Sequence, residues 1–506
     1  MTTTIPPYRS RLHPARAGFR HLLRAEWTKF WTVRVRLLVL AVAAVVTVVI
    51  SQLGASGSHS EGPVQVVTGP DGTVVNDAFH LTHRPLTGDG TVTVRVTGLR
   101  SADGGALESW AKAGLMIKAN LEPGSPYAAV LTTPDHGIRM QWNFTGDTPG
   151  SAADAPHWLR LTRSGDRVTG YDSTDGTHWR KIRDVRLSGL PHTTQVGIFV
   201  ATPAHQVLHR SFGGTSETFG GGKVTGTFDH LALRGTPASA AWRSTDVGGP
   251  MPNGPRRADA EQGRTTTDAS GEHTLTGRGD IAPDESGGDT VQMSFQGVFV
   301  GVLFMVALGA LFMTGEYKRG LIRTTFTATP GRIRVLAAKT LVIGSVTFAV
   351  SLPATAVAFT LAQSTLRANG YEPPQFPDYS LLDTPALRAI VGSAALLSLV
   401  AVLALAVGVL LRTSAGTIAA VLVLVILPQI LAFALPLPAA HWLLRVTPAA
   451  AFAIQQGVTY YPQAENNCLP ESGCYPMQPV HGLLVLAAYA LVALLLAAWR
   501  LRRRDA

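Results

Sequence analysis

Residues 37–55 read LLVLAVAAVVTVVISQLGA, nineteen positions without Asp, Glu, Lys or Arg. A helix rises about 1.5 Å per residue, so about 20 apolar residues cross the roughly 30 Å hydrocarbon core of a bilayer. Five further uncharged runs of 20 to 24 residues follow, at 295–314, 340–362, 389–411, 414–437 and 480–499. The sequence therefore predicts a polytopic α-helical membrane protein with about six transmembrane helices.

The formal net charge of +10 is concentrated beside these runs. Residues 1–36, the segment 316–339 and the tail 500–506 hold most of the excess Lys and Arg. Short basic segments next to apolar spans are typical of cytoplasmic loops. We therefore expect a multi-pass protein of the plasma membrane with both termini cytoplasmic. This topology accounts for the charge, so no nucleic-acid partner is expected.

The same rule places the remaining segments on the outer side. Residues 56–290 would be extracytoplasmic, as would the loops 363–388 and 438–479. The region 291–506 would then contain transmembrane helices 2 to 6, with a cytoplasmic loop at 316–339.

The inserted segment 56–236 has no long apolar run and shows short alternating runs such as GTVTVRVTGL, HWLRLTRS and QVGIFVAT. Turn-forming sequences such as GPDG, TGDG and TDG separate these runs, as in tight hairpins. We expect an all-β sandwich domain here. The Gly- and Pro-rich residues 237–290 are expected to form a flexible linker, to which HTLTGRGDIAP adds one short strand.

Several of these runs resemble the concanavalin-like (laminin-G-like) β-sandwich, namely WAKAGLMIKA, YAAVLTTPDHGIRMQWN, and HWLRLTRSGDRVTGYDSTDGTHWRKI with the hairpin Ser173–Trp179. The resemblance implies a fold found in secreted, glycan-associated proteins, but fold alone does not assign a ligand. Aromatic side chains of this domain are candidates for stacking on sugar rings, or else belong to its core. The candidates are Trp110, Trp142, Trp158 and Trp179.

The leader GFRHLLRAEWTKFWTVRVR, residues 18–36, repeats large apolar side chains every three or four positions, with Arg and Lys between them. This periodicity predicts an amphipathic helix in the interface of the bilayer, with its aromatic side chains at headgroup depth.

The segment TGEYKRGLIRTTFTATPGRIRVLAAK, residues 314–339, resembles the coupling region of type-2 ABC exporter membrane subunits (permeases). In that family the loop after the second span docks on a separate ATPase. The resemblance assigns this ATPase contact to Glu316, Tyr317, Gly320, Arg323, Thr324, Thr325, Pro330 and Arg332. The leader is similar to the family's elbow helix, through Glu26, Trp27, Lys29, Phe30 and Trp31.

The expected function is that of an exporter's permease subunit, moving an unidentified substrate with the energy of ATP hydrolysis. The chain has no Walker A sequence, so the partners implied are a cytoplasmic ABC ATPase, which would hold ATP and magnesium, and a second permease protomer. We expect no cofactor, metal or catalytic residue in this chain, and no enzyme activity of its own. The alternative is a membrane-anchored protein that binds or senses a glycan or envelope component without transport.

The sequence contains two cysteines, Cys468 and Cys474, in NNCLPESGCY. On the outer side of the membrane they could form a disulfide, or they could remain two unpaired thiols.

Overall fold

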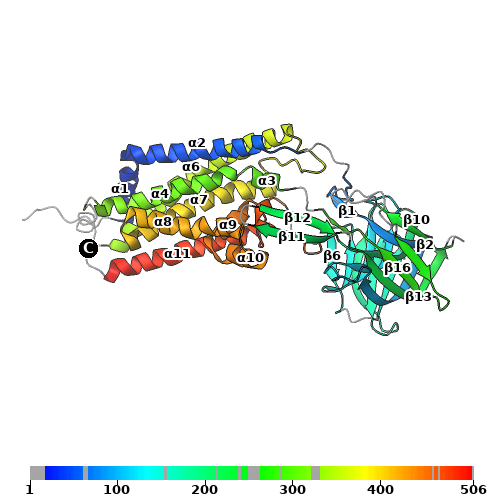
Figure 1. Cartoon of the computed structure of the whole chain (residues 1–506). Coiled ribbons are helices and arrows are strands. Elements are labelled where there is room, and N and C mark those ends of the chain that lie inside the picture. The colour runs from blue at the N-terminus through cyan, green and yellow to red at the C-terminus, as the bar shows by residue number, and fades with distance from the viewer. Residues whose placement is uncertain are drawn as a thin grey trace, which may run out of the picture.

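The computed structural model describes most of the chain. The described residues are 18–60, 66–152, 156–211, 214–220, 222–237, 241–248, 263–284, 288–318, 320, 331–458, 461–464 and 468–503. They form an elongated helical bundle with a β-rich domain at one end (Figure 1).

Six helices in the described part of the chain are long and apolar enough to cross a membrane. They are α2 (Arg34–Gly57), α4 (Gln296–Lys318), α6 (Arg332–Ala368), α7 (Thr384–Leu411), α8 with α9 (Ser414–Val425, Leu427–Ala432) and α11 (Pro479–Arg503). The shorter helices are α1 (Phe19–Thr32), α3 (Thr290–Met293), α10 (Leu437–Val446) and the 3-10 helices η1 (Pro448–Gln455) and η2 (Pro470–Ser472).

Each predicted span corresponds to one of these helices, and most helices extend beyond the apolar run. The helix α6 is 37 residues long, and it contains Pro353 without a break. The fifth span is divided at Ile426 into α8 and α9. Pro428 follows at the start of α9 and has no N–H to donate, which explains the interruption.

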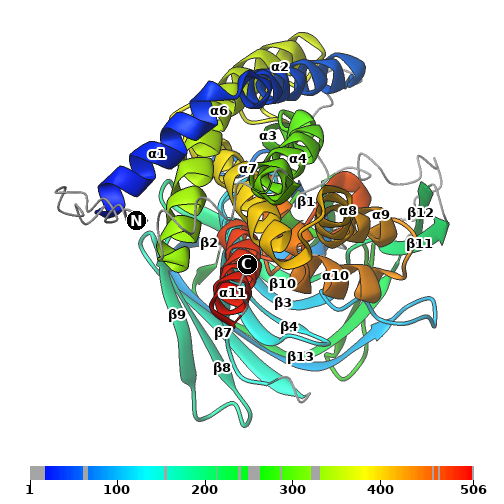
Figure 2. The same ribbon diagram turned by 90° about the vertical axis from the view of Figure 1, so that its left-hand side faces the viewer.

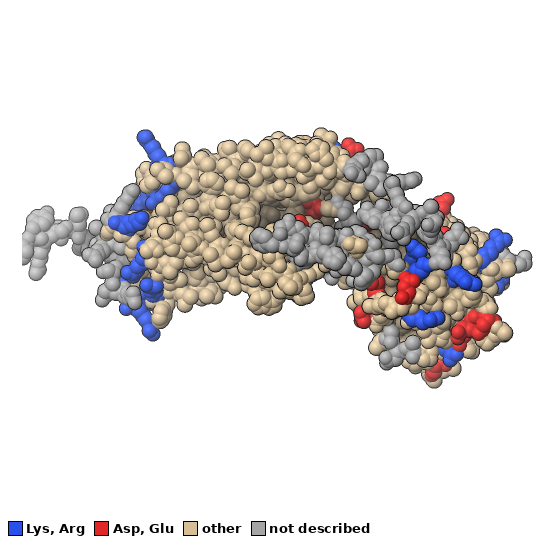
Figure 3. Space-filling model, viewed as in Figure 1, with Lys and Arg blue, Asp and Glu red and all other residues tan. Residues whose placement is uncertain are grey.

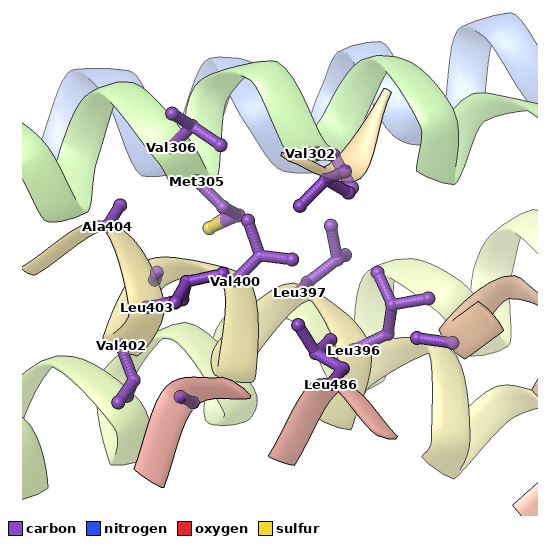
Figure 4. Close-up of a cluster of buried hydrophobic side chains, with 14 of the residues drawn as sticks. Val302, Met305, Val306, Leu396, Leu397, Val400, Val402, Leu403, Ala404 and Leu486 are labelled. Atoms are coloured by element: carbon purple, nitrogen blue, oxygen red, sulfur yellow. The ribbon is translucent and has the colours of Figure 1, made fainter. Parts of the chain in front are cut away.

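The core of the bundle lies between α4, α7 and α11. Val302 and Met305 of α4 point toward Leu397 and Val400 of α7 (Figure 4). On the other side of α7, Leu396 meets Leu486 of α11 (Figure 4). Gly309 allows α4 to approach α7 closely, because a Cβ atom there would lie 2.2 Å from the carbonyl oxygen of Ala401.

Residues 438–479, expected to form a loop, contain helical structure. The first part of this segment folds back into the bundle as α10 and η1, and every residue of η1 is buried. The sequence of η1, PAAAFAIQ, is almost entirely apolar and small, so it packs between helices. At Gly482 of α11 a Cβ atom would lie 1.9 Å from the carbonyl oxygen of Ala450 in η1.

The described residues contain seventeen strands, and all belong to the β-rich domain except a separate hairpin of residues 205–220, which lies beside α9 (Figure 1). Those of the first half are β1 (Val75–Asp77), β2 (Phe79–Ser101), β3 (Lys112–Lys118), β4 (Tyr127–Thr133), β5 (Gly137–Trp142), β6 (Gly146–Pro149), β7 (His157–Ser164), β8 (Arg167–Ser173) and β9 (Arg180–Arg186). The others are β10 (Thr193–Ala201), β11 (His205–Ser211), β12 (Gly214–Gly220), β13 (Val224–Pro237), β14 (Arg243–Val247), β15 (Arg264–Thr267), β16 (His273–Gly277) and β17 (Ile281–Pro283).

The 23-residue strand β2 organises this domain. Its first half pairs with β10, which continues the sheet through β3, β4, β5 and β6. Its second half pairs with β7, which leads to β8 and β9, and β13 lines its other edge. The two halves curve over a shared apolar core that includes Val130 and Met140 from one side and Leu161 and Val168 from the other. The result is a nearly closed, barrel-like sheet (Figure 2).

The expected flexible linker 237–290 is corrected by the structure. Four strands lie in it: β14 pairs with β2, β15 and β16 extend the sheet from β13, and β17 pairs with β1. Between β16 and β17, the Asp280 carboxylate forms a buried ion pair with the Lys112 ammonium at 2.7 Å. The short strand predicted in HTLTGRGDIAP is present, since that segment contains β16 and β17. The strands β14 and β15 were missed because they are short and polar, as RTTT in β15 shows, and their backbone pairing does not require apolar alternation.

Charge separates the two ends of the molecule. Lys and Arg gather at the end of the bundle away from the β-rich domain, and the visible middle of the bundle carries none (Figure 3). At that basic end α4, α7 and α11 finish and α2, α6 and α8 begin (Figure 1). The β-rich domain carries both signs of charge (Figure 3).

Candidate functional site

The helix α1 lies across the basic end of the bundle, whereas α2 runs along the bundle (Figure 1). It buries Leu22, Glu26 and Phe30, which lie four residues apart on one face, and it exposes Trp27 and Trp31. The chain turns at Val33, which is extended, before α2 begins. The predicted amphipathic helix therefore has the expected pattern, except that its buried face includes a carboxylate.

That carboxylate belongs to a cluster of four charged side chains from three helices, Glu26 and Lys29 of α1, Glu316 of α4 and Lys339 of α6. We call it the Lys339 cluster. The Lys339 ammonium donates to Glu26 Oε2 at 2.7 Å and to Glu316 Oε1 at 2.6 Å. The Lys29 ammonium donates to Glu26 Oε1 at 2.8 Å and lies 3.7 Å from Glu316 Oε1.

Burial makes this pairing obligatory. The side chain of Lys339 is fully buried, and those of Glu26 and Glu316 are 1% and 7% exposed. A buried charge without a partner costs several kcal/mol, so removal of one member exposes the others to that cost. Two carboxylates and two ammonium groups make the cluster neutral as a whole.

The pKa values of Glu26 and Lys29 in α1 reflect the balance between burial and the opposite charges of the Lys339 cluster. Burial alone would raise the pKa of Glu26, but the charges of Lys339 and Lys29 outweigh it and hold that pKa below its ordinary value. Burial alone would lower the pKa of Lys29, but Glu26 and Glu316 outweigh it and raise that pKa. The charged forms are therefore the stable ones.

Aromatic rings pack against the Lys339 cluster. The Phe312 ring of α4 lies 4.9 Å from the Lys339 ammonium and 4.7 Å from the Arg36 guanidinium. The Phe30 ring meets the Phe312 ring edge-on, with centroids 5.6 Å apart. The ion pairs and these rings join α1, the end of α4 and the start of α6 into one packed unit.

The predicted coupling residues fall into two groups. Glu316 is buried and faces Lys339. Tyr317 is half-buried, with the Arg412 guanidinium 5.3 Å from its ring centre. Gly320 has a left-handed backbone with φ of +67°, and Arg332 donates to the carbonyl oxygen of Leu501 at 3.1 Å. The other coupling residues, Arg323, Thr324, Thr325 and Pro330, lie outside the described residues.

The four candidate tryptophans do not form one platform. Trp110 is 4% exposed and stacks on His136 with ring centres 3.9 Å apart, so it belongs to the interior. Trp142 packs against the β-domain core. Trp158 and Trp179 are half-buried neighbours on the outer side of the sheet, where both contact Gly176.

The two cysteines form the disulfide Cys468–Cys474. The loop around it joins the bundle to the β-rich domain. Gln292 of α3 donates to the carbonyl oxygen of Gly473 at 2.6 Å. Gln463 donates to the carbonyl oxygens of Phe144 and Thr145 in the turn after β5, at 3.3 and 3.0 Å.

A serine, a histidine and an aspartate that the sequence did not suggest as a group also meet in the β-rich domain. Ser151 Oγ lies 3.0 Å from His157 Nε2, and it donates to Asp172. In a hydrolytic triad the carboxylate would instead orient the histidine through its other nitrogen. His157 and Asp172 are buried, and Arg180 neutralises Asp172, so the group is a structural hydrogen-bond network.

No group of three or more His, Cys, Asp or Glu side chains suited to a metal occurs among the described residues.

Comparison with known proteins gives no assignment. No protein-family model matches the chain, and no curated protein matches it in sequence. Among solved structures, a functionally unknown protein from Saccharomyces cerevisiae is similar at 16% identity and a TM-score of 0.23, over 35% of this chain and 94% of the other. Scytalido-glutamic peptidase gives 10% identity and a TM-score of 0.24 over 40% and 98% of the two chains. The GH43 protein BlXynB from Bacillus licheniformis gives 18% identity and a TM-score of 0.17 over 22% and 24%. Scores this low support no conclusion about fold or activity.

Proposed function

We propose that this chain is the membrane-spanning subunit of an ATP-driven exporter in the plasma membrane, and that its basic end faces the cytoplasm and docks on a separate ATPase. The observation that carries the proposal is the Lys339 cluster. It joins the interfacial helix α1 to the two helices, α4 and α6, that flank the segment 319–331.

The cluster gives that segment a mechanical role. A force applied between α4 and α6 reaches α1 through Lys339, since the ammonium bonds to carboxylates of both neighbouring helices. The buried ion pairs resist separation because each parted charge would lie in an apolar environment. A partner that binds segment 319–331 would therefore move three helices together.

The energy source must be external to the chain, because its sequence has no Walker A loop for nucleotide phosphates. The partner protein would hold ATP and magnesium. Alternating access in such a system would use a second copy of the permease or a related chain.

The charge distribution supports the proposed orientation. The end with α1 carries Lys and Arg, and short basic segments beside spans remain on the cytoplasmic side. The β-rich domain and the disulfide loop would then lie outside, where a disulfide is stable. Because Gln463 links that loop to the turn after β5, the external domain would report on the state of the bundle or regulate it.

Co-purification tests the proposal. The tagged full-length protein is solubilised from its native host in several detergents with a non-hydrolysable ATP analogue. Mass spectrometry should then identify a co-purifying protein with a Walker A sequence. Recovery of no such protein in any detergent would contradict the exporter assignment and favour a membrane-anchored binding protein.

A further inference from the structure

The outer face of β2, β7 and β13 carries an ordered set of polar and aromatic side chains. In β2, Val92, Val94 and Val96 are buried in the domain core, so Thr93 and Arg95 point outward. Strand pairing places outward residues in rows. One row is Asp229, Arg95 and Trp158, and the next is Ala232, Thr93 and Arg160.

A bulge in β13 adds a histidine to this face. The register between β13 and β2 shifts between Asp229 and Ala232, so one extra residue is inserted there. His230 adopts a left-handed backbone with φ of +51°, which is unfavourable for a residue other than glycine. Its side chain is 59% exposed, and its ring lies 5.1 Å from the ring of Trp158.

Neighbouring side chains hold these groups in place. Arg95 forms a bidentate ion pair with Asp229, whose carboxylate also lies 3.0 Å from His230 Nδ1. The Trp179 indole donates to the carbonyl oxygen of Gly176 at 3.0 Å, and the Arg160 guanidinium lies 3.7 Å from the centre of its ring. Two tryptophans and two arginines are therefore fixed side by side on one face.

The face has an excess of positive charge. Arg95 is neutralised by Asp229, but among the described residues no carboxylate forms an ion pair with Arg160 or Arg234. The strand β2 lies between these two arginines, since Arg160 is paired with Thr93 and Arg234 with Thr91. By contrast, Arg167 of the neighbouring strand β8 is paired with Asp184.

We propose that this face, made of Arg95, Trp158, Arg160, Trp179, His230 and Arg234, binds an acidic polysaccharide. Half-exposed indole rings provide apolar surfaces for the C–H faces of sugar rings. Guanidinium groups provide paired donors for carboxylates. The Nε of Arg160 donates to Thr93 Oγ1 at 3.3 Å, so its two terminal nitrogens and the guanidinium of Arg234 are the groups without a carboxylate partner among the described residues. The threonine hydroxyls between them supply donors and acceptors for sugar hydroxyls. This binding does not require the ATPase partner, so it can fail or succeed independently of the exporter assignment.

Binding is tested with the full-length protein in lipid nanodiscs at physiological salt. The probe is immobilised polygalacturonate, an acidic polysaccharide, and pullulan serves as the neutral polysaccharide. The wild-type protein should bind polygalacturonate and not pullulan. Arg160→Gln and Trp179→Ala should each weaken binding by about tenfold, the effect of one charged hydrogen bond or one stacked ring. Arg167→Gln, which removes the same charge from the paired arginine of β8, should change binding less than about twofold.

Inorganic polyphosphate separates sugar recognition from charge. It should bind more weakly than polygalacturonate, and Trp179→Ala should leave its binding unchanged. The proposal is overturned if polyphosphate and polygalacturonate bind alike and respond alike to Trp179→Ala, if Arg167→Gln weakens binding as much as Arg160→Gln, or if the wild-type protein does not bind polygalacturonate. Thermal unfolding of each variant within about 2 °C of wild type shows that the fold is retained.

Discussion

The ammonium of Lys339 lies 2.7 Å from Oε2 of Glu26, a residue 313 positions earlier in the chain. This contact joins a helix that lies across the end of the bundle to a helix that runs through it. Because both side chains are buried, the contact is a fixed part of the structure, in contrast to a surface ion pair that contributes little.

Replacing the central cation should destabilise the bundle. Lys339→Met leaves the buried carboxylates of Glu26 and Glu316 without their shared donor, with an expected loss of about 3–5 kcal/mol in stability. The triple variant Lys339→Met, Glu26→Gln, Glu316→Gln removes the charges together and should be less destabilised than Lys339→Met alone. Thermal unfolding in detergent measures both. Equal losses for the single and triple variants would show that the charge balance is unimportant.

Acid should remove the contribution of Glu26. Its pKa in the folded protein is below the ordinary value of 4.5, so the charged form stabilises the fold. That contribution is complete above the unfolded pKa and is lost as the pH falls through the folded pKa. The difference in melting temperature between wild type and Glu26→Gln should therefore be constant from neutral pH down to about pH 5 and should shrink at lower pH. A difference that grows on acidification would contradict this assignment.

Two glycines of α4 provide a matched pair for the helix packing. Gly309→Ala would place a methyl group 2.2 Å from the carbonyl oxygen of Ala401. At Gly315, by contrast, no atom of the described residues outside the adjoining helix backbone lies within 4 Å of the corresponding position. We expect Gly309→Ala to cost about 1–3 kcal/mol. Gly315→Ala should be neutral or slightly stabilising, since alanine favours helix by about 1 kcal/mol over glycine. Melting temperatures that fall equally for both would show that α4 and α7 are not in close contact there.

The disulfide should stabilise the loop that joins the bundle to the β-rich domain. Its cysteines are six positions apart, and closing so small a loop contributes about 2 kcal/mol in the chain-entropy model. Replacing both Cys468 and Cys474 with serine should increase amide hydrogen exchange at Gln463 and in the turn that contains Phe144. Exchange that is unchanged at both places would show that the disulfide does not hold this junction.

Local sequence properties predicted the helices well. The runs that became α2 and α7 needed only length and apolar composition, and α1 needed only its three-to-four residue spacing. The β-rich domain was predictable where strands alternate strongly, as in β7. By contrast, β15 has the polar sequence RTTT, which shows no apolar alternation. It joins the sheet through backbone pairing with β16.

The candidate site was less predictable. Lys339 ends a basic segment and resembles any other cation beside a span, so nothing in its neighbourhood indicates that it is buried. Its partners are set by the packing of α1 and α4 against α6, which brings distant parts of the chain together. The bulge at His230 depends in the same way on the register between β13 and β2.

The most direct test of the proposed function is crosslinking at the basic end in living cells. Lys318, the last residue of α4, is exposed, and it is replaced by the photo-reactive p-benzoylphenylalanine. The matched control carries the same group at Asp103, an exposed residue of the β-rich domain. Illumination should join the Lys318 variant, and not the Asp103 variant, to a protein with a Walker A sequence. A nucleotide-binding protein crosslinked at Asp103, or none at Lys318 despite efficient incorporation, would contradict an ATPase docked at this end.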